Sequence, residues 1–301
     1  MGERMTFDAR KGKTAPASGQ QNALFAVVTF VVVCGAFFAV LSLPRKAAVH
    51  MPKPAPVVGS LTPAALPRLP GEHAEAYYLA LGRIDAKAQT ELATRIARTG
   101  KADEVALAGL VMDHAGQVLR THAAELAAAD TKHVDRLLDL ARDRLRTASQ
   151  RRSKWCDAVR YADLKEIEFQ DPAQLQQELA ELQAPMREFA FEALTGLMVA
   201  VEDAREHPVE RGALTRTDEA AIQGMMISLM ADPDIMPLMV SLQSGADTKQ
   251  ALKGVNVCNV AATAISAVKT LPQDTKGRML AEAMRNMEKN GPSAFTSGVS
   301  F

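Results

Sequence analysis

Residues 171–206 read DPAQLQQELAELQAPMREFAFEALTGLMVAVEDARE, and this stretch indicates the fold class. Asp171 can cap a helix, and Pro172 suits the first helical turn. Apolar residues then recur every three or four positions, which is the period of one helix face. They are Leu175, Leu179, Leu182, Met186, Phe189, Ala193 and Leu197. Because the period continues through Pro185, we expect a kinked helix or two abutting helices that end before His207.

The second half of this stretch, from Phe189 to Val201, is apolar on most sides. A helix of this composition is buried on several faces, so it is expected to be the central helix. Apolar residues follow the same period over most of residues 72–290, and no alternating strand pattern recurs. Further helices are expected at 73–98 (one helix or a broken pair closed by Gly100), 105–126, 134–148, 217–231, 232–245, 247–270 (one helix, or one that breaks at Gly254 before it continues) and 274–290. The sequence therefore predicts an all-α, bundle-like domain of about seven or eight helices.

A second informative stretch, Ala23–Leu43, contains no charged residue. As a helix it is ~32 Å long, which matches a hydrocarbon core of ~30 Å. The run is longer than the apolar part of a cleaved signal peptide, and Pro44, Arg45 and Lys46 follow it. We therefore expect an uncleaved transmembrane helix at residues 22–43, after a short tail at residues 1–21.

Basic residues near this span indicate its orientation. Four of them (Arg4, Arg10, Lys11 and Lys13) precede the span and three (Arg45, Lys46 and Lys53) follow it closely. The positive-inside rule then places the tail in the cytoplasm and the domain in the periplasm of a bacterial inner membrane. Gly35 and Ala39 form a small-xxx-small pair, which would let two spans associate as a homodimer.

Seven of the fifteen prolines of the chain lie within residues 44–71. Proline fixes φ and removes a backbone donor, so this stretch is expected to be an extended linker. At ~3.1 Å per residue it reaches ~85 Å from the bilayer when fully extended. The helical domain at 72–290 follows, and residues 291–301 are expected to be a flexible tail.

Two cysteines, Cys156 and Cys258, lie in the predicted periplasmic domain. In an oxidising compartment they fit one disulfide that closes a loop of about 100 residues. The alternative is two separate buried thiols, which cysteine also tolerates.

Lys and Arg balance Asp and Glu at 35 each, which argues against a nucleic-acid-binding protein. Cations are concentrated between Lys132 and Arg160, however, and acids between Asp163 and Glu192. The side chains of Arg151, Arg152, Lys154 and Trp155 are the candidate docking site for anionic lipid or an acidic partner. The simpler interpretation is that the two charged segments complement each other within the fold.

Candidate chemistry is sparse. Glu188 and Glu192 stand one helical turn apart and are the only candidate pair for acid and base catalysis. Methionines between 225 and 239 offer soft ligands or an adaptable groove, although filling of a helical core explains them as well. No two histidines have the i, i+4 spacing of a zinc-binding helix, so no metal site and no cofactor are expected.

These features favour a membrane-anchored, non-enzymatic interaction, scaffold or assembly factor that docks other envelope proteins. The anchor would raise the effective concentration of the domain near its partners. The alternatives are a helical envelope enzyme that uses Glu188 and Glu192, and a methionine-based metal or ligand sensor.

Overall fold

The computed structural model of the chain describes residues 67–100, 103–160, 172–233, 235–236, 250 and 252–290. For residues 172–186 and 290 it describes the backbone only. Within these ranges the chain forms nine α-helices and one short 3-10 helix, and it forms no strand. The prediction of an all-α domain is therefore confirmed for the described residues.

The helices are α2 (Glu72–Ile84), α3 (Ala86–Arg98), α4 (Glu104–Thr121), α5 (Ala123–Ala127), α6 (Thr131–Gln150), η1 (Lys154–Cys156), α8 (Pro172–Glu206), α9 (Arg216–Met230), α12 (Val257–Lys269) and α13 (Gln273–Asn290). The expected seven or eight helices are too few, because the chain breaks twice where the apolar period continues. Asp85 separates α2 from α3, as the broken-pair alternative anticipated, and His122 separates α4 from α5. The spacing of apolar residues alone does not indicate such a break in a helix.

Helix α8 is the central element, as the sequence predicts. It runs without interruption from Pro172 to Glu206, so it is one helix through Pro185 and not two abutting ones. In its second half, Phe191, Leu194 and Met198 are completely buried. A helix that is apolar on most sides needs neighbours on several faces, and α8 has them.

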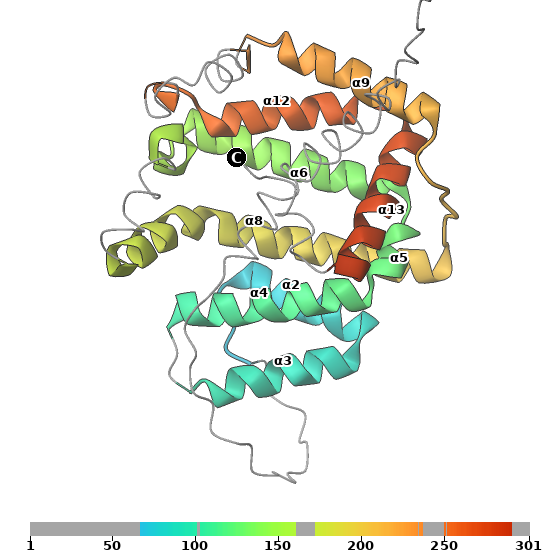
Figure 1. Cartoon of the computed structure of the whole chain (residues 1–301). Helices are drawn as coiled ribbons and strands as arrows, with labels where there is room; N and C mark the ends of the chain where they lie inside the picture. The colour runs from blue at the N-terminus through green and yellow to red at the C-terminus, as the bar shows by residue number, and fades with distance from the viewer. Residues whose placement is uncertain are drawn as a thin grey trace, which may run out of the picture.

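The neighbours of α8 form successive layers (Figure 1). Helix α2 packs along one side of α8, and α3 lies beyond α2. On the other side lie α6, then α12, then α9. The short helix α5 packs against α13 at one end of these layers. Segments from both halves of the chain are thus interleaved in one fold.

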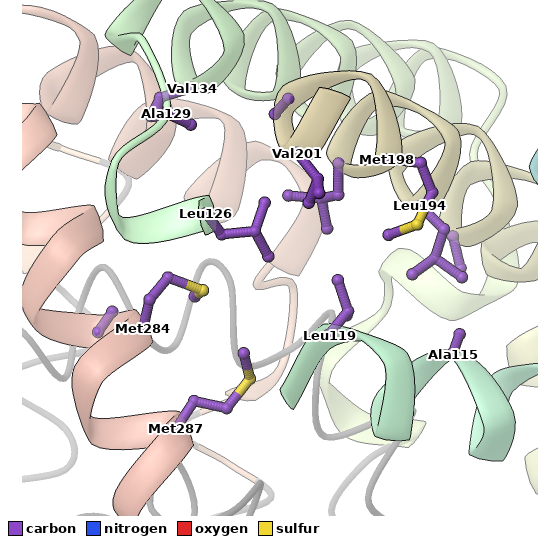
Figure 2. Close-up of a cluster of buried hydrophobic side chains, with 14 of the residues drawn as sticks. Ala115, Leu119, Leu126, Ala129, Val134, Leu194, Met198, Val201, Met284 and Met287 are labelled. Carbon is purple, nitrogen blue, oxygen red and sulfur yellow. The ribbon is translucent and has the colours of Figure 1, made fainter. Parts of the chain in front are cut away.

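The core is continuous where these helices meet, as Figure 2 shows. Leu119 from α4, Leu126 from α5 and Met287 from α13 approach Met198 and Val201 of α8. All five side chains are at least 98% buried. Burial of each such side chain contributes ~2 kcal/mol, so this junction holds the N-terminal and C-terminal helices together.

Side-chain caps explain why several helices begin where they do. A cap accepts hydrogen bonds from backbone N–H groups that have no partner inside the helix. The capping residues are Asp85 for α3, Asp103 for α4, Asp130 for α6, Thr215 for α9 and Asn256 for α12. At α9 the cap is reciprocal, since the side chain of Asp218 also accepts from the backbone of Thr215.

Asp218 is also the centre of a buried polar network that joins α9 to α13. Its carboxylate is only 1% exposed and accepts two hydrogen bonds from the guanidinium of Arg278, at 2.7 and 2.8 Å. The hydroxyl of Thr275 donates a third at 2.6 Å. Arg278 and the hydroxyl groups of Thr215 and Thr275 hold the pKa of Asp218 well below its usual range.

Not every feature expected from the sequence lies within the described ranges. None of the helices described there combines the length and the hydropathy that crossing a bilayer requires. The predicted tail at 1–21, the span at 22–43 and the tail at 291–301 lie outside the described residues, as do most of the predicted linker and of the helix at 232–245.

Candidate functional site

The C-terminal end of α6 reverses the chain abruptly. Arg152 has a φ of +52°, which places it in the left-handed region that usually favours glycine. Its N–H donates to the carbonyl of Ser149 at 2.9 Å, and the N–H of Ser153 donates to the carbonyl of Ala148 at 3.0 Å. This pair of bonds is a Schellman motif, which ends the helix and directs the chain into η1.

Because a side chain disfavours this backbone conformation, Arg152→Gly is expected to raise the free energy of unfolding by about 1 kcal/mol. Urea denaturation of the full chain measures the change. Arg151→Gly is the matched control, since Arg151 has a φ of −76° and gains nothing from glycine. Equal effects of the two substitutions would show that the backbone at Arg152 is not strained.

The disulfide predicted from the sequence is present and joins this end of α6 to the start of α12. Cys156 and Cys258 are bonded, with their Cα atoms 5.1 Å apart, and both residues are buried. Two further contacts connect the same segments: the N–H of Ala158 donates to the carbonyl of Val255 at 3.1 Å, and the amide of Asn256 donates to the hydroxyl of Ser149 at 3.0 Å. The corner is therefore fixed by covalent and polar links together.

Four cations are exposed on this corner. Arg151, Arg152 and Lys154 were anticipated, whereas Lys253 comes from the turn before α12. Trp155 precedes Cys156 in the chain and packs, half-buried, against the cluster that contains the disulfide. We call these five residues the basic corner. None of its four cations has a carboxylate partner among the residues that the structure describes.

Elsewhere on α6, three of the five Lys and Arg residues pair with carboxylates within the fold. Arg144 donates to Glu192 of α8 at 2.7 Å, and Lys132 lies 3.0 Å from Asp203 of the same helix. Arg142 lies 2.7 Å from Asp139 on its own helix. Of these pairs, only that of Arg144 with Glu192 joins the cation-rich segment 132–160 to the acid-rich segment 163–192. Arg136 and Arg146 of α6 are exposed and, like the cations of the basic corner, have no carboxylate partner among the described residues.

One structural role accounts for part of this charge. Cations beyond the carbonyl end of a helix stabilise its dipole by about 0.3–1 kcal/mol each. Arg151 and Arg152 directly follow the last residue of α6 and benefit in this way. Lys154 lies farther along the chain and Lys253 belongs to another segment, so the dipole of α6 does not explain all four.

The two candidate catalytic carboxylates have different surroundings. The side chain of Glu188 is 47% exposed, and its Oε2 lies 3.9 Å from Nε2 of His73 in α2. Glu192 instead binds Arg144 of α6. A catalytic carboxylate pair needs a shared, desolvated environment. These two residues lack one, which removes the feature that favoured a helical enzyme.

The methionines divide into two groups. Met225 is buried on α9, which agrees with the core-filling interpretation. That interpretation is wrong for Met230 and Met236, which are 45% and 48% exposed, because they lie on the solvent side of α9 and of the turn after it. In the described ranges, no group of three or more His, Cys, Asp and Glu residues is placed to hold a metal ion.

Two buried histidines form clusters that sequence reasoning missed. His122, at the break between α4 and α5, lies 3.2 Å from Glu125 and 3.4 Å from Asp85. His133 of α6 lies 2.9 Å from Asp203 of α8. The distant partners are 37 and 70 positions away along the chain, so no local motif could signal them.

The second cluster predicts a pH dependence. Contacts with His133 and then Lys132 lower the pKa of Asp203 to about 2. A carboxylate with a lowered pKa stabilises the fold above its unfolded pKa of about 4, and this stabilisation is lost as the pH falls towards 2. We expect Asp203→Asn to remove on the order of 1 kcal/mol at neutral pH and less at pH 2. Denaturation of both proteins across this pH range is the measurement, and a pH-independent difference would contradict the prediction.

Comparison with known proteins gives no further guidance, since no family model, curated protein or solved structure matches the chain.

Proposed function

We propose that the protein is a membrane-anchored, non-enzymatic interaction protein whose helical domain docks on an anionic surface through the basic corner. The feature that supports this proposal most directly is the set of four exposed cations that have no carboxylate partner among the described residues. They lie together at the end of α6, where Arg151, Arg152 and Lys154 follow within four residues of the chain and the turn before α12 adds Lys253.

The construction of the corner also supports docking. Side chains on flexible loops lose conformational entropy when they bind, and a fixed backbone reduces that loss. Here the disulfide, the Schellman motif and the contacts to the α12 turn fix the backbone that carries the cations. Backbone strain at Arg152 is consistent with selection for a side chain at this position.

The predicted anchor gives the docking its mechanism. A helix at residues 22–43 and a linker at 44–71 would keep the domain close to the bilayer, at an effective concentration of the order of millimolar. Under that condition a weak surface is sufficient, because a second binding event on the same membrane is nearly intramolecular. We assign the domain to the periplasmic side of the inner membrane, where a disulfide persists.

Site-specific photo-crosslinking of the full chain in its own membrane tests the docking. A photoreactive residue at Lys154 is expected to give an adduct, and one at Lys87, an exposed cation of α3, is expected to give none. Arg151→Gln together with Arg152→Asn should abolish the adduct at position 154. An adduct of equal yield at both positions would contradict docking through the basic corner.

A reporter fused after Phe301 tests the anchor separately. Activity restricted to the periplasmic side, with the chain in the membrane fraction, is expected. Recovery of the chain in the soluble fraction, or reporter activity in the cytoplasm, would overturn the proposed topology and the docking role that depends on it.

A further inference from the structure

We infer that the surface recognised by the basic corner is a bilayer that contains anionic phospholipid, so that the domain lies against the membrane that anchors it. This inference rests on the proposed function. It specifies the partner of the basic corner, which the proposed function describes only as an anionic surface.

The modest binding affinity that four cations supply favours a bilayer over a soluble acidic protein as the partner of the corner. Each cation near an anionic membrane increases partitioning about fivefold, so four cations increase it several hundredfold. An increase of this size corresponds to weak binding when the partner is a protein that diffuses freely. It is sufficient for the bilayer that anchors the chain, because the 28-residue linker keeps the domain within ~85 Å of that bilayer even when fully extended.

The residue types at the corner also fit a lipid surface. Long Lys and Arg side chains reach phosphate groups without requiring one fixed geometry. Trp155 offers an amphipathic ring beside them, and tryptophan is enriched where membranes meet water. The only exposed acid in the turn itself, Asp157, accepts a hydrogen bond from the N–H of Val159 at 3.1 Å. Among the described residues, the corner thus combines four exposed cations with one half-buried aromatic ring.

The protein carries its own reporter for the test, because Trp155 is the only tryptophan of the chain. The full chain is reconstituted into vesicles of phosphatidylcholine, or of phosphatidylcholine with phosphatidylglycerol. Both contain a lipid that is spin-labelled at the headgroup and quenches tryptophan fluorescence at short range. We expect strong quenching only in the vesicles with phosphatidylglycerol, and its loss at about 0.5 M salt, where the Debye length is below ~5 Å.

The variant Arg151→Gln/Arg152→Asn/Lys154→Gln is expected to lower the equilibrium constant for docking of the corner on the bilayer about 100-fold at low salt. Asn is chosen at position 152 because it tolerates a positive φ. The matched control is Lys87→Gln/Arg98→Gln/Arg216→Gln, which removes three exposed cations from α3 and α9 and should leave quenching unchanged. The measurement of quenching at high salt uses the unmodified chain, so the test does not depend on the folding of a variant.

The outcomes separate the two proposals. Equal quenching of Trp155 in both kinds of vesicle would overturn lipid recognition by the corner. An equal loss of quenching in the corner variant and in the control variant would overturn it as well. Vesicles that carry the chain on flotation but do not quench Trp155 would also overturn it. In that case, a protein adduct at position 154 in the crosslinking experiment would identify an acidic protein as the partner. A chain that does not float with either vesicle would instead show that the anchor of the proposed function is absent.

Discussion

Removing the disulfide is expected to produce one of the two largest losses of stability in this protein. The variant Cys156→Ala/Cys258→Ala should have a free energy of unfolding lower by about 4 kcal/mol. The bond joins residues 102 positions apart, so its loss releases a long loop in the unfolded chain. It also removes the covalent link between η1 and α12, beside which the hydrogen bonds of Ala158 and Asn256 remain. Urea denaturation of the full chain is the measurement.

Reduction provides the matched comparison. A reductant should destabilise the unmodified chain by a similar amount and leave the double variant unchanged. If the reductant shifts both proteins equally, the bond does not account for the loss. The basic corner should respond too, because Cys156 follows Trp155 directly, and quenching of Trp155 by aqueous iodide should increase when the bond is broken.

The second large effect is expected at Asp218. Asp218→Ala should destabilise the fold by about 3–5 kcal/mol, because one partner of a buried ion pair is removed while Arg278 and Thr275 remain. The same substitution removes half of the capping box of α9. Since the pKa of Asp218 is strongly lowered, its contribution is present above pH 4 and is lost only in strong acid.

Glu219→Ala is the control for this prediction. Glu219 is the next residue of α9 and carries the same charge, but it is exposed. Its replacement should cost less than about 1 kcal/mol, through the helix dipole alone. A loss at Asp218 that is no larger than the loss at Glu219 would show that the network between α9 and α13 is not a main support of the fold.

Local patterns predicted the helices well where packing follows periodicity. The stretch 171–206 predicted α8, including its start at Pro172 and its end before His207. The apolar run Phe189–Val201 predicted the part of α8 in which Phe191, Leu194, Met198 and Val201 are completely buried. The break at His122 was missed because the apolar residues on both sides of it keep the same spacing. Periodicity reports which face is buried and not whether the axis continues.

The candidate site was predictable only in part. Arg151, Arg152 and Lys154 stand out as a local cluster of cations, and the two cysteines could be paired by number and compartment. Lys253 was missed because the disulfide and the turn before α12 bring it to the corner from the far end of the loop. The positive φ of Arg152 was also not predictable, because arginine has no preference for that conformation.

The sequence by itself determined that the domain is helical, where most of its helices begin and end, and which stretch lies at its centre. Those properties follow from caps, proline and the spacing of apolar residues, which act over a few positions. Only the tertiary structure decided which charges are paired. It gave Glu188 and Glu192 different partners, joined Asp218 to Arg278, and left the four cations of the basic corner exposed. Pairing depends on distances between segments far apart in the chain, and those distances are set when the helices pack.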